Sequence, residues 1–169
     1  IEEGLASPIT YNIVDPSTVP ENSPPGAMGA ARLSLVEDLY SKFYASTVEN
    51  PSSSWGTAFP AVQAFQLLIW EISHENFSGD TSDTDAGRAN MMSQVDLDAG
   101  AFIGASSSGG MLDTNIATAV TNMANGMGVG GWGTFARLAG ASNVDNQDLL
   151  IVVPSPAIAG LAGLGLVGM

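Results

Sequence analysis

The sequence predicts an α+β fold in which short antiparallel strands accompany about three helices. Apolar residues recur at helical spacing in three segments. Short runs rich in β-branched and aromatic residues, bounded by turn residues, lie around those segments, and no internal repeat is present. A chain of 169 residues fits one domain. We therefore expect a single domain over residues 1–153 and an apolar C-terminal tail over residues 154–169.

Three segments predict helices. Met28–Tyr44 carries an apolar stripe of Leu33, Val36, Leu39, Tyr40 and Phe43. Thr57–Glu75 is apolar on most sides, with Pro60 where a first-turn proline is expected, so we place this helix at the centre of the domain. The third, Met111–Gly128, places apolar side chains on one face and ends near Gly126: Leu112, Ile116, Val120 and Met123.

Four segments predict strands: Ser7–Pro16, Gln94–Ala105, Trp132–Ser142 and Gln147–Val153. Pro16–Gly29 is proline-rich and indicates an extended loop, and Asn76–Arg88 indicates a polar, acidic loop. The glycine-rich run Gly126–Gly131 satisfies G-x-G-x-x-G, but it follows a helix and leads to a strand. That order is the reverse of a dinucleotide site, so we interpret the run as a close-packing connector.

The composition excludes several classes of function. The net charge is −13, from 17 acidic side chains against four basic ones: Arg32, Lys42, Arg88 and Arg137. Nucleic acid is excluded as a partner because phosphate binding needs many Lys and Arg side chains. The pI near 4.1 suits a secreted protein that stays soluble outside the cell. The chain has no cysteine, which excludes disulfides, thiolate metal sites and thiol nucleophiles.

Asp80, Asp83 and Asp85 form the candidate metal site. Their carboxylates are closely spaced in the acidic loop, and hard oxygen ligands suit Ca²⁺. The twelve-residue calcium-loop pattern is not met, because no glutamate stands at the closing position. A solvated loop is therefore the alternative. In the same region, Asn76-Phe77-Ser78 is a sequon, which makes Asn76 a candidate glycosylation site.

Two polar positions stand out on the central helix. Glu71-x-x-His74 matches half of a helical di-iron site, but His74 is the only histidine, so we interpret it as a helix-surface pair. Gln66 is expected at the apolar face or its edge, with its amide hydrogen-bonded. No credible catalytic constellation is present, so we expect that the protein is not an enzyme.

"AFQLLIWEISHE" (Ala64–Glu75) resembles the "FQLAIWEI" helix of bacterial surface proteins related to thioester domains. In that family, the motif's glutamine forms an internal thioester with a cysteine on an earlier strand. The resemblance implies that Gln66 holds the thioester position. No cysteine is present to pair with it in this chain.

"DNQDLLIVVPSPAIAGLAGLGLVGM" resembles the C-terminal sorting signal of secreted bacterial proteins of the PEP-CTERM class. The resemblance rests on the Pro-x-Pro motif, Pro154-Ser155-Pro156, followed by a small apolar segment. Serine replaces the usual glutamate, and the cluster of arginines that follows in the family is missing here. The resemblance implies a secreted protein at the bacterial cell surface, with transient association with the membrane or envelope.

The tail is too short to cross a bilayer alone. Ala157–Met169 spans about 20 Å as a helix, against a hydrocarbon core of roughly 30 Å. As a strand it reaches about 43 Å and is apolar on both faces. A neighbouring subunit's sheet can cover such a strand by strand addition. The expected subunit contacts are Ile158, Leu161, Leu164, Leu166, Val167 and Met169.

We therefore expect a secreted structural subunit that polymerises head-to-tail with copies of itself into an extracellular filament. The alternative is a cell-surface adhesion or matrix domain that its sorting tail holds at the envelope, with a glycan as a further partner. The only cofactor that the sequence suggests for either is calcium.

Overall fold

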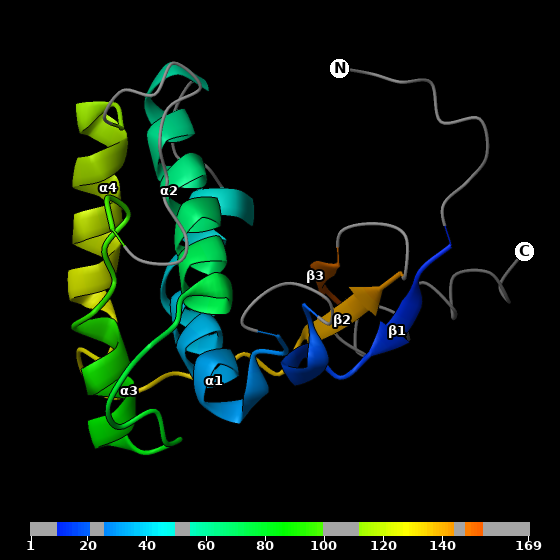
Figure 1. Cartoon of the computed structure of the whole chain (residues 1–169). Helices are drawn as coiled ribbons and strands as arrows, with labels where there is room; N and C mark the ends of the chain where they lie inside the picture. The colour runs from blue at the N-terminus through cyan, green and yellow to red at the C-terminus, as the bar shows by residue number, and fades with distance from the viewer. Residues whose placement is uncertain (1–9, 21–25, 50–54, 100–111, 144–147, 154–169) are drawn as a thin grey trace, which may run out of the picture.

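The predicted α+β class is confirmed. The computed structural model describes residues 10–20, 26–49, 55–99, 112–143 and 148–153, and within them it has four α-helices and a three-stranded antiparallel sheet. The helices group on one side of the molecule and the sheet lies on the other (Figure 1). The fourth helix is one more than the sequence indicated.

The first predicted helix is present and longer than expected. Helix α1 (Gly29–Leu39) continues without a break into the π-helical segment η2 (Tyr40–Glu49). Upstream, a single 3₁₀ turn, η1 (Pro16–Thr18), begins where the Asp15 side chain accepts a hydrogen bond from the amide of Ser17. The extended loop predicted from Pro16 therefore starts with a capped turn.

The central helix α2 (Trp55–His74) begins before its predicted start. Pro60 consequently lies inside the helix rather than in its first turn, and it has no amide hydrogen to donate to the preceding turn. The helix packs against both α1 and α4 (Thr114–Gly126), as the central position predicts. Within the described part of the chain, no helix has both the length and the hydropathy needed to cross a membrane.

The helix that the sequence reading missed is α3 (Asp85–Met92), which lies partly in the segment predicted to be a loop. The side chain of Thr84 caps it by accepting a hydrogen bond from the amide of Gly87 at 3.1 Å. A threonine cap with Asp85 in the first turn is a helix-start signal. The polar composition of the segment concealed that signal.

The sheet has the order β1-β2-β3 and joins the two ends of the described chain. Its strands are β1 (Asn12–Val14), β2 (Leu138–Ser142) and β3 (Leu149–Val152). Both pairings are antiparallel, and the register places Ile13 and Leu149 on either side of Ala141. The strand predicted at Gln94–Ala105 is wrong over residues 94–99, which are turn and irregular backbone; residues 100–105 lie outside the described residues.

The core lies between the helices and extends to the inner face of the sheet. Its fully buried apolar side chains come from α1, α2 and α3: Leu35, Val36, Leu39, Leu68, Ile72 and Met91. Tyr40 stacks on Tyr44 at 5.2 Å between ring centroids and contacts the rings of Phe65 and Phe135. Burial among these rings raises the pKa of Tyr40 to about 12. This aromatic cluster joins α2 to the connector that leads into the sheet.

Candidate functional site

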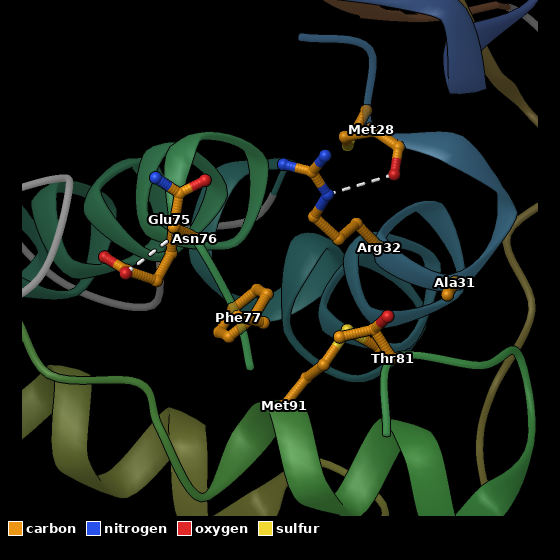
Figure 2. A pocket seen from close by; sticks show the side chains of 8 residues that line it. All are labelled: Met28, Ala31, Arg32, Glu75, Asn76, Phe77, Thr81 and Met91. Carbon is orange, nitrogen blue, oxygen red and sulfur yellow. Dashed lines mark hydrogen bonds between the residues drawn. The ribbon is translucent and has the colours of Figure 1, made fainter. Parts of the chain in front are cut away.

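Asn76, the candidate glycosylation site, is exposed just after the end of α2. It borders a cavity between α1, α3 and the segment that follows α2 (Figure 2). The third residue of the sequon, Ser78, donates from its amide and its hydroxyl to Oε1 of Gln94, at 2.9 and 3.0 Å. The structure thus leaves the asparagine side chain accessible.

The three candidate metal ligands do not converge. Asp80 accepts a hydrogen bond from the amide of Ser82 at 3.0 Å, whereas Asp83 and Asp85 both pair with Arg88. Among the described residues, no group of three or more acidic or histidine side chains lies close enough together to hold a metal ion. In the structure Arg88 pairs with two of these carboxylates, and calcium binding by the three stays a prediction.

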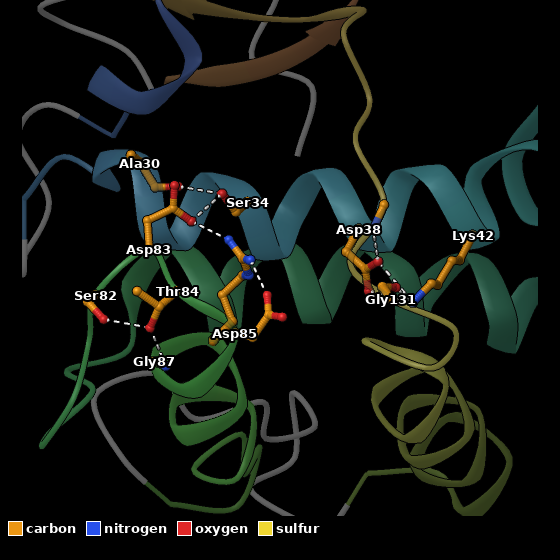
Figure 3. Close-up of polar contacts among 12 residues, drawn as sticks. Ala30, Ser34, Asp38, Lys42, Ser82, Asp83, Thr84, Asp85, Gly87 and Gly131 are labelled. Carbon is orange, nitrogen blue, oxygen red and sulfur yellow. Dashed lines mark hydrogen bonds and ion pairs between the residues drawn. The ribbon is translucent and has the colours of Figure 1, made fainter.

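The acidic loop instead fastens α3 to α1. Asp83 accepts hydrogen bonds from Arg88 at 2.5 Å and from the hydroxyl of Ser34 on α1 at 2.8 Å (Figure 3). Asp85 accepts a second bond from Arg88 at 2.6 Å. The guanidinium also lies over the ring of Trp132, 5.3 Å from its centre. The acidic loop is thus a structural clamp between three parts of the chain.

Asp38 is a buried charge that the sequence reading did not single out. It lies on α1 with no exposed surface. Its two carboxylate oxygens accept the amides of Gly128 and Gly133, at 2.9 and 2.6 Å. Lys42, one turn later, lies 2.9 Å from the same carboxylate and donates to the carbonyl of Gly131 (Figure 3). One carboxylate therefore holds the whole glycine-rich connector.

The expected position of Gln66 is wrong. Gln66 is exposed, and it shares the solvent face of α2 with Phe59 and Trp70, which are 50% and 36% exposed. These residues are seven and four positions apart, which places them on one helical stripe. The thioester-like position therefore faces solvent rather than the apolar core.

The polar side chain that α2 buries is Glu71. With Ala64, Leu68, Ile72 and Glu75, it lies on the face that packs against the core, and its own exposed fraction is 0%. The interpretation of Glu71 and His74 as a surface pair is wrong for this reason. The Nδ1 atom of His74 lies 2.8 Å from the hydroxyl of Ser73 and 3.1 Å from the carbonyl of Trp70.

The Glu71 carboxyl is only half satisfied. Its Oε1 accepts the amide of Asp96 at 2.9 Å, whereas Oε2 has no hydrogen-bond partner among the described residues. Burial raises the pKa of Glu71 to about 7; the amide of Asp96 opposes this shift, and the nearby charges of Glu75 and Asp96 add to it. Near neutral pH this carboxyl is therefore divided between its protonated and ionised forms.

The sheet presents an apolar face to the side away from the core. We call it the outer face, and it consists of Ile13, Ala139, Ala141, Leu149, Ile151 and Val153. The side chains of Val14, Leu138, Leu150 and Val152 take the opposite face and pack on the core. On the outer face, Ile13 is 66% exposed and Leu149 and Val153 are each 42% exposed, whereas Ala139 and Ala141 of the central strand are buried. Strands β1 and β3 are the two edges of this sheet in the described residues.

The predicted sorting motif Pro154-Ser155-Pro156 and the predicted subunit contacts from Ile158 to Met169 lie outside the described residues. They follow directly on Val153, the last described residue, which belongs to the outer face. Comparison with known proteins adds no assignment: no protein-family model, no curated protein and no solved structure matches this chain.

We predict that Asp38→Asn lowers the free energy of unfolding by about 2–4 kcal/mol, because a buried ion pair is broken and one connector amide loses its acceptor. Urea denaturation followed by circular dichroism measures the loss. Asp98→Asn removes an exposed carboxylate and serves as the control, with a change within about 0.5 kcal/mol. A similar stability for both variants would contradict the role given to Asp38.

We predict that Glu71 makes stability fall as pH rises. The pKa of Glu71 is about 7 in the folded state and 4.5 in the unfolded state, so between these pH values the folded state holds a proton that the unfolded state has lost. The free energy of unfolding therefore falls as pH rises through this window, and the loss is complete above the folded pKa. Glu71→Gln should therefore gain on the order of 1–3 kcal/mol relative to wild type at pH 8, but little at pH 4. Urea unfolding at both pH values tests this, with the exposed Glu49→Gln as the matched control. An equal gain for Glu71→Gln at both pH values would refute it.

Proposed function

We propose that this protein is a secreted, non-enzymatic structural subunit at the bacterial cell surface that assembles with copies of itself into an extracellular filament. The apolar tail of one copy packs on the sheet of the next. The observation that carries the proposal is the outer face, which exposes large apolar side chains beside two edge strands.

Exposed apolar side chains on a sheet with free edges favour association. An edge strand presents unpaired amide and carbonyl groups to an added strand, and the side chains of that strand need an apolar surface. The large side chains of Ile13 and Leu149 lie on either side of the small side chain of Ala141, which leaves a shallow depression along the central strand. A strand that is apolar on both faces, such as the tail, can place side chains over Ala141.

The tail follows β3 directly, which makes the contact head-to-tail. Strand β3 is four residues long and offers about 13 Å of edge for pairing. The extended tail reaches roughly 43 Å, so only part of it can pair with β3. The remaining tail residues then lie on the apolar surface beyond the edge. Because the donor segment and the acceptor surface differ, each copy keeps one of each free, and the assembly does not close.

We predict that deleting Ala157–Met169 leaves a folded monomer that no longer assembles. Sedimentation velocity and negative-stain electron microscopy measure the outcome, and circular dichroism checks the fold. Filaments formed by the truncated protein would overturn the proposal.

Two point variants locate the acceptor surface. Leu149→Lys places a charge on the outer face and should abolish assembly, because the charge has to be buried under the incoming tail. Phe59→Lys, at the exposed start of α2, is the matched control and should leave assembly unchanged. If both variants assemble as wild type does, the outer face is not the acceptor.

The second candidate function is a cell-surface adhesion or matrix domain that the tail holds at the envelope. The resemblance of Pro154-Ser155-Pro156 and the segment after it to a sorting signal favours this reading. Fractionation of the producing cells separates the two candidates: the protein in the envelope fraction supports the anchored domain, and shed polymer supports the filament.

A further inference from the structure

Arg32 differs from the other three cations of the protein, each of which pairs with a carboxylate: Lys42 with Asp38, Arg88 with Asp83 and Asp85, and Arg137 with Glu49. Arg32 donates instead to the backbone carbonyls of Met28, Ser73 and Ala27, at 2.9–3.0 Å. In the described parts of the chain it forms no ion pair, although acidic residues outnumber basic ones by 17 to four.

The charge of Arg32 is poorly solvated. Burial lowers the pKa of its guanidinium below the usual value. The three carbonyls fix the plane of the group but supply no negative charge. A guanidinium has five N–H donors, so two remain available for a ligand. A half-buried cation in this state is suited to a carboxylate, which it can bind with two parallel hydrogen bonds.

The same side chain lines a cavity of about 250 Å³ between α1, α3 and the segment that follows α2. Figure 2 shows Arg32 on one wall, with Phe77 and Met91 below it and Asn76 across the opening. This volume is less than the ~300–1,000 Å³ of pockets that take drug-sized ligands, so it suits a ligand the size of a monosaccharide. The lining residues are Met28, Ala31, Arg32, Glu75, Asn76, Phe77, Thr81 and Met91.

The start of α1 adds to the preference for an anion. The helix N-terminus borders the cavity through Met28, Ala31 and Arg32, and the side chain of its N-cap residue, Met28, makes no capping hydrogen bond. The N-terminus of a helix carries partial positive charge, which disfavours a cation in the first turn and favours an anion beside it. A bound carboxylate would offset the unfavourable position of Arg32.

Glu75 narrows the class of anion. Its side chain also lines the cavity, and its Oε1 accepts the amide of Asn76. A multiply charged phosphate is repelled by this carboxylate and by the net charge of −13. A singly charged ligand meets less of this repulsion. The half-buried ring of Phe77 supplies an apolar surface for the face of a sugar ring.

We propose that this cavity binds a sugar acid of monosaccharide size, a uronic acid, with its carboxylate on Arg32 and its ring on Phe77. The hydroxyl groups of the sugar face Asn76 and Thr81. The proposal does not depend on assembly, because the cavity lies between the helices and away from the sheet.

The test is a titration of the full chain with D-glucuronate, followed by ¹H–¹⁵N spectra and calorimetry. We expect a Kd in the millimolar range, with amide shifts at Ala31, Phe77 and Thr81. Glucose and inorganic phosphate should each bind at least about tenfold more weakly, since one lacks the carboxylate and the other is repelled. Equal binding of glucose, or of phosphate, would overturn the proposal.

Variants complete the test. Arg32→Gln should weaken glucuronate binding at least about tenfold, whereas Arg137→Gln, at the partly exposed arginine near the sheet, should not change it. Arg32 also holds three carbonyls, so Ala31→Leu, which fills the cavity from α1 and suits a helix, is the second variant. It should abolish binding while circular dichroism stays unchanged. Binding that survives Ala31→Leu in a folded protein would refute the site.

Discussion

The arrangement of the sheet against the helices depends on one buried carboxylate, that of Asp38. It accepts the amides of Gly128 and Gly133, which lie at the two ends of the turn that leads from α4 toward β2. A buried charge costs several kcal/mol unless it is paired and hydrogen-bonded, and here Lys42 and the two amides meet that condition. The turn cannot move away from α1 without leaving the carboxylate unsatisfied. This constraint fixes where the chain enters the sheet.

The glycines of the connector follow from that constraint. Gly128 has a φ of +71°, a backbone conformation that residues with a side chain rarely adopt. A side chain at Gly133 would collide with Ser41. Because the turn is fixed, Trp132 comes to lie beneath Arg88 and Phe135 against Tyr40 and Tyr44. The first contact orders the acidic loop, and the second closes the aromatic cluster.

Sequence reasoning located the candidate site only in part. Asp80, Asp83 and Asp85 are close in sequence, but whether they gather around an ion depends on Arg88, which approaches two of them from α3. On α2, apolar residues lie on most sides, so the sequence allows several orientations of the buried face. Whether Gln66 or Glu71 is buried depends on which other elements cover the helix. The 4-3-4 spacing of Ala64, Leu68, Glu71 and Glu75 was the available signal. Arg32 gave none, because its partners are backbone carbonyls, which every residue carries: two are local, at Met28 and Ala27, and one is on α2, at Ser73.

The sequence by itself determined the α+β class, the existence of α1, α2 and α4, and the two C-terminal strands, since hydrophobic periodicity is a local property that burial on one face imposes. The sequence also contained a local signal for the start of α3, the capping residue Thr84. The tertiary structure decided which polar groups are buried, which carboxylates are neutralised, and which apolar side chains of the sheet stay exposed. Those outcomes depend on contacts between residues far apart in the chain, such as Asp38 and Gly133. No local pattern specifies such contacts, because desolvation and hydrogen-bond satisfaction are set by all the elements that pack together.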